Sequence, residues 1–512
     1  MVSDTEVLVV GGGLVGLTAG ALLARQGVRC LVVERHQGTS IHPRFRGITA
    51  RSMEIYRGIG VERSIRDVGD VDEALGLIAK VNTLADDELA LVELPKEEAA
   101  TGISPTELLA VDQDQLEPIL LARARELGAE VVFDTELTGF DQDGRGVTAM
   151  LIDRATGARR TVRAAFLLAA DGVRSPVREQ LGIARHGPGV FAQRMSMVFR
   201  ADLSKALRGR VFFSCLIEKL GAHLVRRRPG VWQLSVPYDP DRGEGPDDFP
   251  ERRCLELLRT ATGIPDLEAE LISVLPWELS ALIVEKYRHG RIFLAGDAAH
   301  VWPPYGGLNG NTGIQDAHNI VWKLAAVLHG HAGPGLLDTY EVERRPVAEL
   351  TMKWALRRMQ EESAPGTVEY SEDYSTIGFG YRYHSAAIPG GKPGVLTEDP
   401  RRPSGDPGTR AAHLTLAGEQ LSTLDLFGHT HDPVLLLGIA ADGWAHAAKQ
   451  LGVTAHRIGH ERFSEAYGVA DDGASLIRPD GFIAWRSRTG ADDPEHELRQ
   501  AIGRLYQSEE HA

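Results

Sequence analysis

The sequence predicts an α/β fold in which a mostly parallel sheet carries an inserted, strand-rich region. Three observations indicate this class. A glycine-rich turn separates an apolar run from a helix near the N-terminus, two later apolar runs each end beside an aspartate and a glycine, and residues 186–280 are rich in β-forming segments. A chain of 512 residues, 43% of them hydrophobic, is long enough for two to four domains.

The first predicted unit is a strand, a helix and a second strand. Val7–Val10 is an unbroken apolar run typical of a buried strand. Leu14–Gln26 places apolar side chains at helical spacing and stops before Gly27, and Cys30–Val33 is again apolar. We therefore expect a βαβ unit in this part of the chain.

The turn "GGGLVG" inside this unit carries the spacing Gly11-x-Gly13-x-x-Gly16. Such glycines allow a tight turn and close approach of the backbone to a ligand, and the helix N-terminus offers free N–H groups to a pyrophosphate. Glu34 follows the second strand, where a carboxylate accepts a hydrogen bond from a ribose hydroxyl. Together these features predict a Rossmann-like dinucleotide site rather than an ordinary glycine-rich turn.

Two more apolar strands are predicted to end at the same edge of the sheet. Phe166–Ala170 is followed by Asp171-Gly172, and Ile292–Ala295 is followed by Gly296-Asp297. Ligands of open α/β sheets bind outside the carboxyl ends of the strands, so these residues should lie near the dinucleotide.

Two helices complete the predicted site. One lies within residues 111–128, with Gln113 just ahead of its apolar face and free to reach a ligand. The other begins near Thr312, after the proline pair at 303–304 and a glycine-and-asparagine loop at 306–311. Its N-terminal dipole favours an electron-rich ligand group.

Composition and motifs exclude several classes of function. The net charge of −15 and the pI of about 5.7 disfavour nucleic acid and anionic membranes as partners. No apolar run reaches the length of a membrane span, and we expect no signal peptide because the first strand follows the N-terminus directly. Cys30, Cys215 and Cys254 form no CxxC pair, so we expect a reducing, cytoplasmic location and no bound metal.

These segments, in this order, resemble the FAD-binding signature of the para-hydroxybenzoate-hydroxylase class, the single-component (class A) FAD aromatic monooxygenases. The stretches "HPRFRGITARSMEIYRGIG", "PYDPDRGE", "FGYRYHSAA" and "EDPRRPSGDPGTRAAH" resemble the aromatic polyketide hydroxylases, including anthracycline and angucycline hydroxylases. The resemblance covers essentially the whole chain. It implies the para-hydroxybenzoate-hydroxylase fold: a Rossmann-like FAD domain, an inserted β-sheet substrate domain and a thioredoxin-like C-terminal domain.

The resemblance also implies domain boundaries. The expected FAD-binding domain comprises residues 1–72, 111–185 and 281–395, the substrate-binding sheet residues 73–110 and 186–280, and the thioredoxin-like domain residues 396–512. The last of these contains no cysteine, so we expect it to serve packing or dimer contacts rather than dithiol chemistry. The turn Arg478-Pro479-Asp480-Gly481 predicts a hairpin within it.

By the resemblance, the turn glycines hold the FAD pyrophosphate, Glu34 binds the adenosine ribose, and Arg46 and Gln113 contact the flavin half. The cofactor-binding residues implied are Gly11, Gly13, Leu14, Val15, Gly16, Glu34, Arg35, Arg46, Gln113, Leu137, Asp171, Gly172, Gly296, Asp297, Pro304, Gly307, Gly310 and Asn311. The chain departs from the family's Gly-x-Gly-x-Asn loop at Asn309, where asparagine can still adopt the left-handed backbone of such a turn.

Catalytic and substrate residues are implied on other segments. Pro304 borders the flavin ring, and Arg358, on the helix after Pro346, is a candidate partner for a substrate phenolate, although an arginine there is more often on a solvated helix face. Phe213, His223 and Gln233 are candidate substrate contacts. Phe213 occupies a position where related hydroxylases can carry tyrosine, and a plain core aromatic is the alternative.

The implied activity is hydroxylation of a polycyclic aromatic phenol or quinone, with non-covalent FAD, NADPH or NADH as transient reductant, and O₂. Three alternatives stay open: Baeyer–Villiger oxygenation, hydroxylation of a simpler phenol, and a non-enzymatic flavin- or ligand-binding protein. A flavin halogenase is disfavoured because its Trp-x-Trp-x-Ile-Pro motif is absent. The expected assembly is a monomer or a homodimer.

Overall fold

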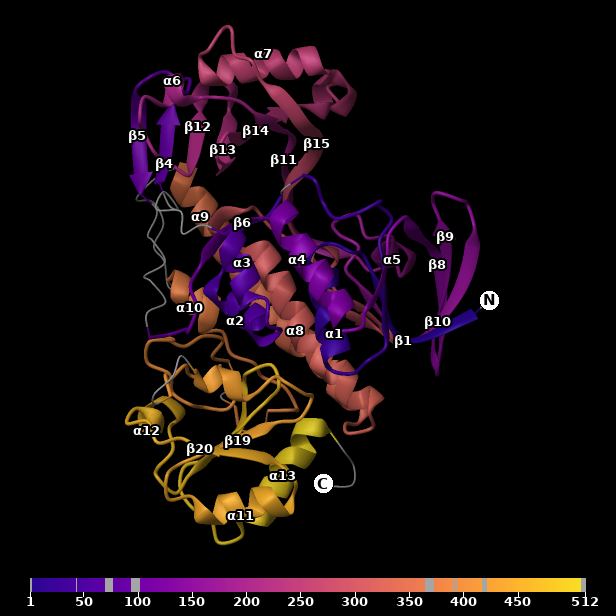
Figure 1. Ribbon diagram of the computed structural model, residues 1–512, viewed down its shortest axis with the longest axis vertical. Helices are drawn as coiled ribbons and strands as arrows, with labels where there is room; N and C mark the ends of the chain where they lie inside the picture. Colours follow the sequence, from indigo (N-terminus) through magenta and orange to yellow (C-terminus); the bar gives the residue numbers. More distant parts are fainter. Residues whose placement is uncertain are drawn as a thin grey trace.

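The computed structural model describes residues 2–42, 44–69, 77–93, 102–363, 373–388, 390–391, 394–416 and 421–507. Three parts follow one another along its long axis (Figure 1). A strand-rich layer lies at the top, a sheet flanked by helices at the centre, and a smaller α/β unit at the bottom. Among the described residues, no helix is both long and apolar enough to cross a membrane.

The central sheet has the strand order β16-β17-β10-β1-β2-β7, and the β8–β9 hairpin joins it through β10. Its strands are β1 Val2–Val10, β2 Cys30–Val33, β7 Glu130–Val132, β8 Thr135–Asp143, β9 Gly146–Asp153, β10 Arg159–Ala169, β16 Arg288–His289 and β17 Ile292–Leu294. β1 pairs in parallel with β10 on one side and β2 on the other. Burial on both faces explains the unbroken apolar runs from which the sequence predicted these strands.

Helices pack around this sheet. Those of the central part are α1 Leu14–Arg25, α2 Ala50–Gly58, α3 Glu62–Val68, α4 Gln113–Glu126, α5 Pro176–Gln180, α8 Leu308–Leu328, α9 Thr339–Ser363 and α10 Tyr374–Phe379, with a short β3 Arg46–Ile48 and β6 Leu109–Asp112 ladder beside them. The predicted first helix is therefore correct to within one residue. The helix predicted near residue 113 contains Gln113 as its first residue instead of following it.

The start of α8 differs from the prediction. The helix begins at Leu308, not near Thr312, so Asn309 lies in its first turn. The expectation of a left-handed Asn309 is wrong: the described non-glycine residues with positive φ are Asp134, Arg208 and Gln507. The preceding glycines, Gly306 at φ 80° and Gly307 at φ 67°, provide the left-handed turn, and this leaves Asn309 free to be helical.

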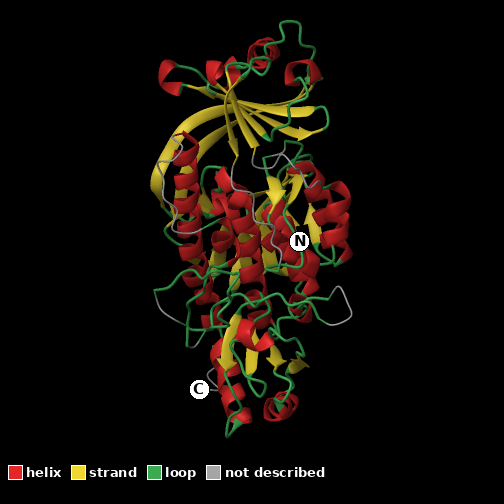
Figure 2. Ribbon diagram, turned by 90° about the vertical axis from the view of Figure 1, so that its left-hand side faces the viewer, coloured by secondary structure: helices red, strands yellow, loops and turns green. Residues whose placement is uncertain are grey.

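The second sheet forms the upper layer, with the order β18-β15-β11-β14-β13-β12-β4-β5. Its strands are β4 Leu77–Val81, β5 Glu88–Glu93, β11 Arg185–Arg200, β12 Ser214–Ile217, β13 Ala222–Arg228, β14 Val231–Tyr238, β15 Glu270–Val284 and β18 His300–Val301. The short α6 Ser204–Leu207 and the longer α7 Glu251–Thr262 pack over its outer side (Figures 1 and 2). β4 and β5 lie in the segment 73–110, which the resemblance assigned to the substrate-binding sheet, and their hairpin joins the sheet where β4 pairs with β12.

The C-terminal part runs β19 Val434–Leu437, α11 Asp442–Gln450, β20 Thr454–Arg457, α12 Phe463–Tyr467, β21 Ala474–Ile477, β22 Ile483–Ser487 and α13 Pro494–Tyr506. Its strand order is β20-β19-β21-β22, with β20 parallel and β21 antiparallel to β19. This βαβ unit followed by a hairpin and a helix has the thioredoxin-like arrangement that the sequence predicted. The predicted turn at 478–481 joins β21 to β22. All three cysteines lie elsewhere, buried and unpaired.

Candidate functional site

A cavity of about 2050 Å³ lies between the central sheet and the upper sheet. One end is lined by the N-terminal glycine turn and the carboxyl ends of β2, β10 and β17, and the other by the inner face of the upper sheet. The turn before α8 and one side of α9 close it laterally. The cavity is therefore continuous from the predicted dinucleotide site to the inserted sheet.

The glycines of this turn allow backbone segments to approach one another closely. A Cβ on Gly11, whose φ is +104°, would lie 2.2 Å from the carbonyl oxygen of Ala170. A Cβ on Gly16 would lie 1.8 Å from the carbonyl oxygen of Gly11, so Gly16 lets α1 pack against the turn but does not line the cavity. Gly13, Leu14 and Val15 do line it, where the first turn of α1 presents unpaired N–H groups.

Glu34 lies at the end of β2 beside this turn. Its Oε2 accepts a hydrogen bond from the Gly12 N–H at 2.7 Å, and its Oε1 accepts one from the His36 N–H at 3.0 Å. These contacts hold the carboxylate at the cavity wall, with Arg35 beside it. The position is the one that the sequence predicted for a ribose-binding acid.

Two aspartates border the middle of the cavity. The Val177 N–H donates to Asp171 Oδ2 at 3.1 Å, while Oδ1 is buried and has no hydrogen-bond partner among the described residues. Burial raises the pKa of Asp171. Burial likewise raises the pKa of Asp297, whose Oδ1 accepts a hydrogen bond from Asn309 Nδ2 at 2.9 Å. An unpaired buried carboxylate oxygen beside an open glycine turn fits a ligand that donates hydroxyl groups.

Besides Gly16, two more of the predicted cofactor residues do not line the cavity. Gly296 packs against α8, where its Cα would lie 2.9 Å from a Cβ on Gly313. Asn311 is buried and fastens the backbone, since its Oδ1 accepts from the Thr49 N–H at 3.0 Å and its Nδ2 donates to the Gly307 carbonyl at 2.7 Å. Both residues shape the turn before α8 from behind. Pro304, Gly307 and Gly310 do line the cavity, as do Gly172 and Leu137.

Arg46 and Gln113 lie on the side wall. Gln113 Nε2 donates to Glu117 Oε1 at 2.6 Å, and its Oε1 accepts from the Arg44 N–H at 3.3 Å. The Arg46 guanidinium lies 3.7 Å from Asp112 and stacks over the ring of Phe213, 5.3 Å from its centroid. Phe213 is therefore a wall residue of the cavity and not a plain core aromatic.

Arg358 projects from α9 into the same cavity and is only 8% exposed. Its guanidinium lies over the ring of Trp354, 5.6 Å from the centroid. Arg358 therefore does not lie on a solvated helix face, which was the alternative for this arginine. A Cβ on Gly306 would lie 2.5 Å from the Trp354 ring, so α9 packs against the turn after Pro304, and both Pro304 and Arg358 line the cavity.

The other two predicted substrate contacts lie on the inner face of the upper sheet. Burial, reinforced by the charge of Arg194, lowers the pKa of His223 to about 4, so its imidazole is neutral at pH 7. Gln233 Oε1 accepts from Arg227 Nε at 2.8 Å. Both side chains therefore present neutral polar groups to the cavity.

Other cavity residues were missed by the sequence analysis. Arg194 donates from Nε to Ser235 Oγ at 3.0 Å and from Nη2 to the Ser235 carbonyl at 2.7 Å. The imidazole of His42 lies between Ser273 Oγ at 2.6 Å and Ser196 Oγ at 3.1 Å. Burial, with Arg44 and Arg227 nearby, lowers the pKa of His42 to about 4. Further missed residues that line the cavity are Arg227, Trp277, Trp302, Tyr305, Trp354 and Tyr374.

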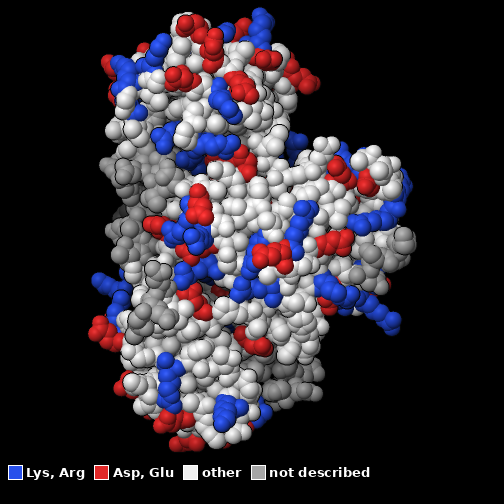
Figure 3. All heavy atoms as spheres, in the orientation of Figure 1, with Lys and Arg blue, Asp and Glu red and all other residues white. Residues whose placement is uncertain are grey.

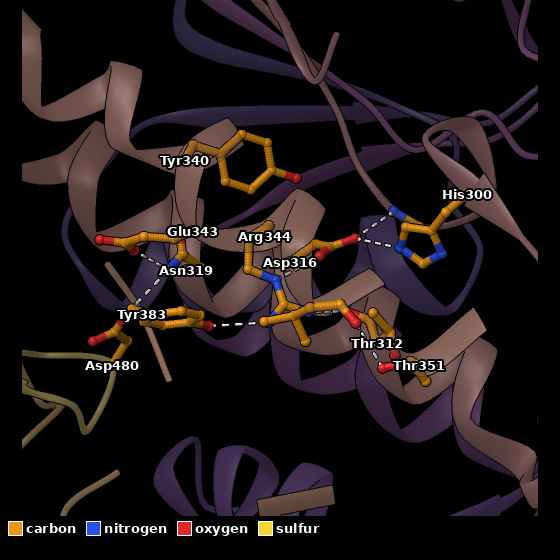
Figure 4. A network of polar contacts seen from close by, with 12 residues as sticks. His300, Thr312, Asp316, Asn319, Tyr340, Glu343, Arg344, Thr351, Tyr383 and Asp480 are labelled. Atoms are coloured by element: carbon orange, nitrogen blue, oxygen red, sulfur yellow. Dashed lines mark hydrogen bonds and ion pairs between the residues drawn. The ribbon is translucent and has the colours of Figure 1, made fainter. Parts of the chain in front are cut away.

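A buried polar network supports the site from behind (Figure 4). Asp316, on α8, accepts hydrogen bonds from the Gly296 N–H at 3.1 Å, from His300 Nε2 at 2.8 Å and from Arg344 Nε at 2.7 Å. The Arg344 charge holds the pKa of Asp316 below its usual range despite complete burial. Arg344 in turn donates to the Tyr383 hydroxyl at 3.0 Å.

The network continues into the C-terminal part. Arg478 donates to Glu343 through both terminal nitrogens, at 2.7 and 2.8 Å, and to Asp480 Oδ2 at 2.6 Å. Lys323 Nζ also donates to Glu343, at 2.7 Å. All four side chains are at most 1% exposed. These bonds fasten the hairpin turn at 478–481 to α8 and α9.

A Rossmann-like sheet, a glycine turn with an acid after the second strand, and a sheet-roofed cavity together define a flavin-dependent oxygenase fold. The chain belongs to the family of FAD-dependent aromatic-ring hydroxylases. Its residues 4–355 match the family model described as FAD binding domain, and residues 404–507 match the one described as aromatic-ring hydroxylase, C-terminal. The predicted enzyme class, fold and FAD cofactor are thereby confirmed.

Relatives and solved structures agree with this assignment over nearly the full length. Aklavinone 12-hydroxylase from Streptomyces purpurascens is 40% identical and aligns with 98% of this chain and 99% of its own. 4-Methyl-5-nitrocatechol 5-monooxygenase from a Burkholderia species is 41% identical, with 98% and 97% covered. The crystal structure of aklavinone-11 hydroxylase with FAD and aklavinone superposes with a TM-score of 0.89, at 39% identity and 99% coverage of both chains.

Proposed function

We propose that this enzyme hydroxylates a polycyclic aromatic polyketide, a phenol or a quinone, with NADPH or NADH as reductant and O₂ as the oxygen source. The observation that carries the proposal is the size of the cavity. At about 2050 Å³ it exceeds the roughly 300–1000 Å³ of a typical small-molecule site, so there is room for a multi-ring substrate beside FAD. The similarity to aklavinone hydroxylases supports the same substrate class.

The residues present fit FAD at the central-sheet end. In the proposal, the backbone of the Gly11–Gly13 turn and the first N–H groups of α1 hold the pyrophosphate, and Glu34 accepts from the adenosine ribose. Asp297 accepts from the hydroxyl groups of the ribityl chain. Arg46 and Gln113 contact the flavin half, and we infer that the cofactor is held without a covalent bond. When bound, FAD supplies the reaction with electrons from the reductant and with activated oxygen.

The protein's own part in the reaction is to position and activate the ring. The upper sheet and α9 cover the substrate and exclude water, so that charge interactions inside are strengthened. Arg358 lies where its guanidinium can stabilise a substrate phenolate, which is the electron-rich form that hydroxylation requires. Phe213 contacts the ring by packing alone, because its side chain can neither hydrogen-bond nor carry a proton.

The first turn of α8 contributes on the cofactor side of the cavity. Its N-terminal N–H groups and dipole face the turn that holds Pro304, and they favour negative charge on a ligand placed there. We propose that this is the ring portion of the cofactor. Pro304 fixes the turn through its restricted backbone, and Gly307 and Gly310 let a flat ring approach closely.

A second candidate substrate class is favoured by one comparison. The relative from Burkholderia, at the same identity as the polyketide enzymes, is named for a single-ring nitrocatechol. A small phenol would leave much of the cavity empty, however, and a loosely held ring favours oxidation of the reductant without product. An experiment must also distinguish hydroxylation from Baeyer–Villiger oxygenation on the same scaffold.

The test is substrate-dependent oxidation of NADPH under ¹⁸O₂, with product mass, for a tetracyclic anthracyclinone, a tricyclic anthraquinone phenol and a single-ring catechol. We expect one labelled oxygen per reductant consumed with the polycyclic phenols. We expect mainly hydrogen peroxide with the catechol. Efficient labelling of the catechol alone would overturn the polycyclic assignment, and label in a lactone would show Baeyer–Villiger insertion.

The proposed domain boundaries approximate the two sheets and the thioredoxin-like unit, although β15 crosses the boundary at 280 and β18 lies in the residues given to the FAD domain. Residues 1–72, 111–185 and 281–395 would form the FAD domain, residues 73–110 and 186–280 the substrate sheet, and residues 396–512 the C-terminal domain. The last has a structural role in the proposal, because its polar network fastens it to α8 and α9. Sedimentation at several concentrations would decide between a monomer and a homodimer.

A further inference from the structure

Four residues with metal-binding side chains meet where the end of α8 contacts the C-terminal part, on the side away from the cavity. His329 is the C-cap of α8 and His331 follows it by two residues. His431 and Asp432 lie just before β19. The 21 residues of α8 separate this cluster from the turn at Gly307 by about 30 Å, so it is distinct from the proposed FAD site.

The possible ligand atoms of three of these residues lie close together. One ligand atom each from His331, His431 and Asp432 lies within 4.8 Å of the other two. The His331 and His431 ring centroids are 4.5 Å apart, and His431 Nε2 lies 3.7 Å from Asp432 Oδ1. His431 Nε2 is buried and has no hydrogen-bond partner among the described residues. A buried imidazole nitrogen without a partner is costly unless something binds it.

These separations suit a transition-metal ion. Zinc binds imidazole nitrogen and carboxylate oxygen at about 2.0–2.2 Å, which places tetrahedral ligand atoms roughly 3.3–3.5 Å apart. The 3.7 Å contact is close to that spacing already. His331 and Asp432 are exposed, so a change of side-chain torsion suffices to bring their ligand atoms into range.

The residues around His431 leave its Nε2 available to bind a metal ion. Its Nδ1 lies 3.4 Å from Nδ1 of His329, so His431 can donate its Nδ1 hydrogen there and leave Nε2 free as a ligand. The His431 carbonyl accepts a hydrogen bond from the Tyr506 hydroxyl at 3.1 Å, and the Tyr506 carbonyl accepts one from the Gly333 N–H at 2.9 Å. The two loops are therefore already tied together through α13.

We propose that His331, His431 and Asp432 bind one divalent transition-metal ion, with Zn²⁺ as the best match, and that the ion clamps the end of α8 to the C-terminal part. Water completes the coordination. His329 acts as a positioning residue that orients His431. The two-imidazole, one-carboxylate ligand set selects Zn²⁺ and its neighbours over Mg²⁺ or Ca²⁺, which prefer oxygen ligands.

The experiment uses the full-length, FAD-loaded protein without a histidine tag. Zn²⁺ and Mg²⁺ are titrated by calorimetry, and Co²⁺ is titrated by its visible absorption after subtraction of the flavin spectrum. We expect one equivalent of Zn²⁺ per chain, a tetrahedral Co²⁺ spectrum that Zn²⁺ displaces, and no heat with Mg²⁺. Zn²⁺ should also raise the thermal midpoint, reversibly on addition of a chelator.

Variants separate this site from adventitious binding. His331→Ala and Asp432→Asn should each weaken Zn²⁺ binding at least tenfold and abolish the rise in thermal midpoint. His446→Ala, an exposed imidazole on α11, is the matched control and should behave as the wild type. Retained flavin and unchanged circular dichroism verify folding. Absent binding in the wild type, or equal binding in wild type and His331→Ala, would overturn the proposal.

Discussion

Replacing Asp316 by asparagine should lower the free energy of unfolding far more than the small change in side-chain shape implies. The carboxylate is fully buried and accepts three hydrogen bonds, from Arg344, His300 and the Gly296 N–H, at 2.7–3.1 Å. The amide of Asp316→Asn retains one acceptor oxygen and turns an N–H₂ donor toward groups that are donors themselves. Arg344 is then left as a buried charge with no carboxylate partner in this network.

The expected cost follows from breaking a buried ion pair on one side, which is about 3–5 kcal/mol. That corresponds to a factor of roughly 100 to 5000 in the folded-to-unfolded ratio. Because the Gly296 N–H belongs to the turn that carries Asp297, FAD retention should fall as well. Urea unfolding followed by circular dichroism measures the first effect, and release of flavin fluorescence measures the second.

A matched control lies on α9, where Arg345 follows Arg344, the ion-pair partner of Asp316. Arg345 Nε pairs with Glu349 at 3.1 Å, but both side chains are about one-third exposed. Glu349→Gln makes the same chemical change at an exposed i,i+4 pair and should cost only about 0.3–0.5 kcal/mol. If Asp316→Asn and Glu349→Gln shifted the urea midpoint equally, the reasoning from the buried network would be refuted.

Three further outcomes are expected. Glu34→Ala should weaken FAD binding by ~1.5–3 kcal/mol, the value of a hydrogen bond to a charged group, and an unchanged Kd in flavin-quenching titrations would remove Glu34 from the ribose site. Acidification should destabilise the fold between about pH 6.5 and 4, because His42 titrates near 4 when folded and near 6.5 when unfolded, so the unfolded state binds the extra proton. His42→Gln should remove the share of this group, up to ~3 kcal/mol, and leave the share of His223, whose pKa is lowered to the same value. Alanine at Cys30, Cys215 and Cys254 should leave turnover intact, and its loss in a folded, flavin-loaded variant would reveal a redox role for a thiol.

The dinucleotide unit was predictable because its physics is local. A buried parallel strand needs consecutive apolar residues, a turn that touches its neighbours needs glycine, and an acid after the second strand follows at a fixed spacing. β2 accordingly has the predicted bounds, Cys30–Val33. The same reasoning identified the ends of β10 and β17, where Asp171 and Asp297 lie.

The inner face of the upper sheet was predictable in principle, although individual contacts were missed. Residues alternate across a strand, and in β11 the apolar Met195 and Met197 lie in the core while Arg194 and Ser196 face the cavity. The segment "QRMSMVF" shows this two-residue period directly. Gln233, in β14, faces the cavity by the same rule.

Asn309 shows why the remaining residues could not be placed from the sequence. Its side chain donates to Asp297 at 2.9 Å and lies 3.3 Å from His300 Nδ1, and His300 bonds in turn to Asp316. The partners lie within residues 297–316 but on a turn, a short strand and a helix, and no strand or helix period relates them. A glycine at this position, as in the related loops, would leave the buried Asp297 carboxylate without this donor. Asn309 therefore stabilises that carboxylate by a hydrogen bond. It is not needed for the turn, since the glycines before α8 already provide the left-handed geometry.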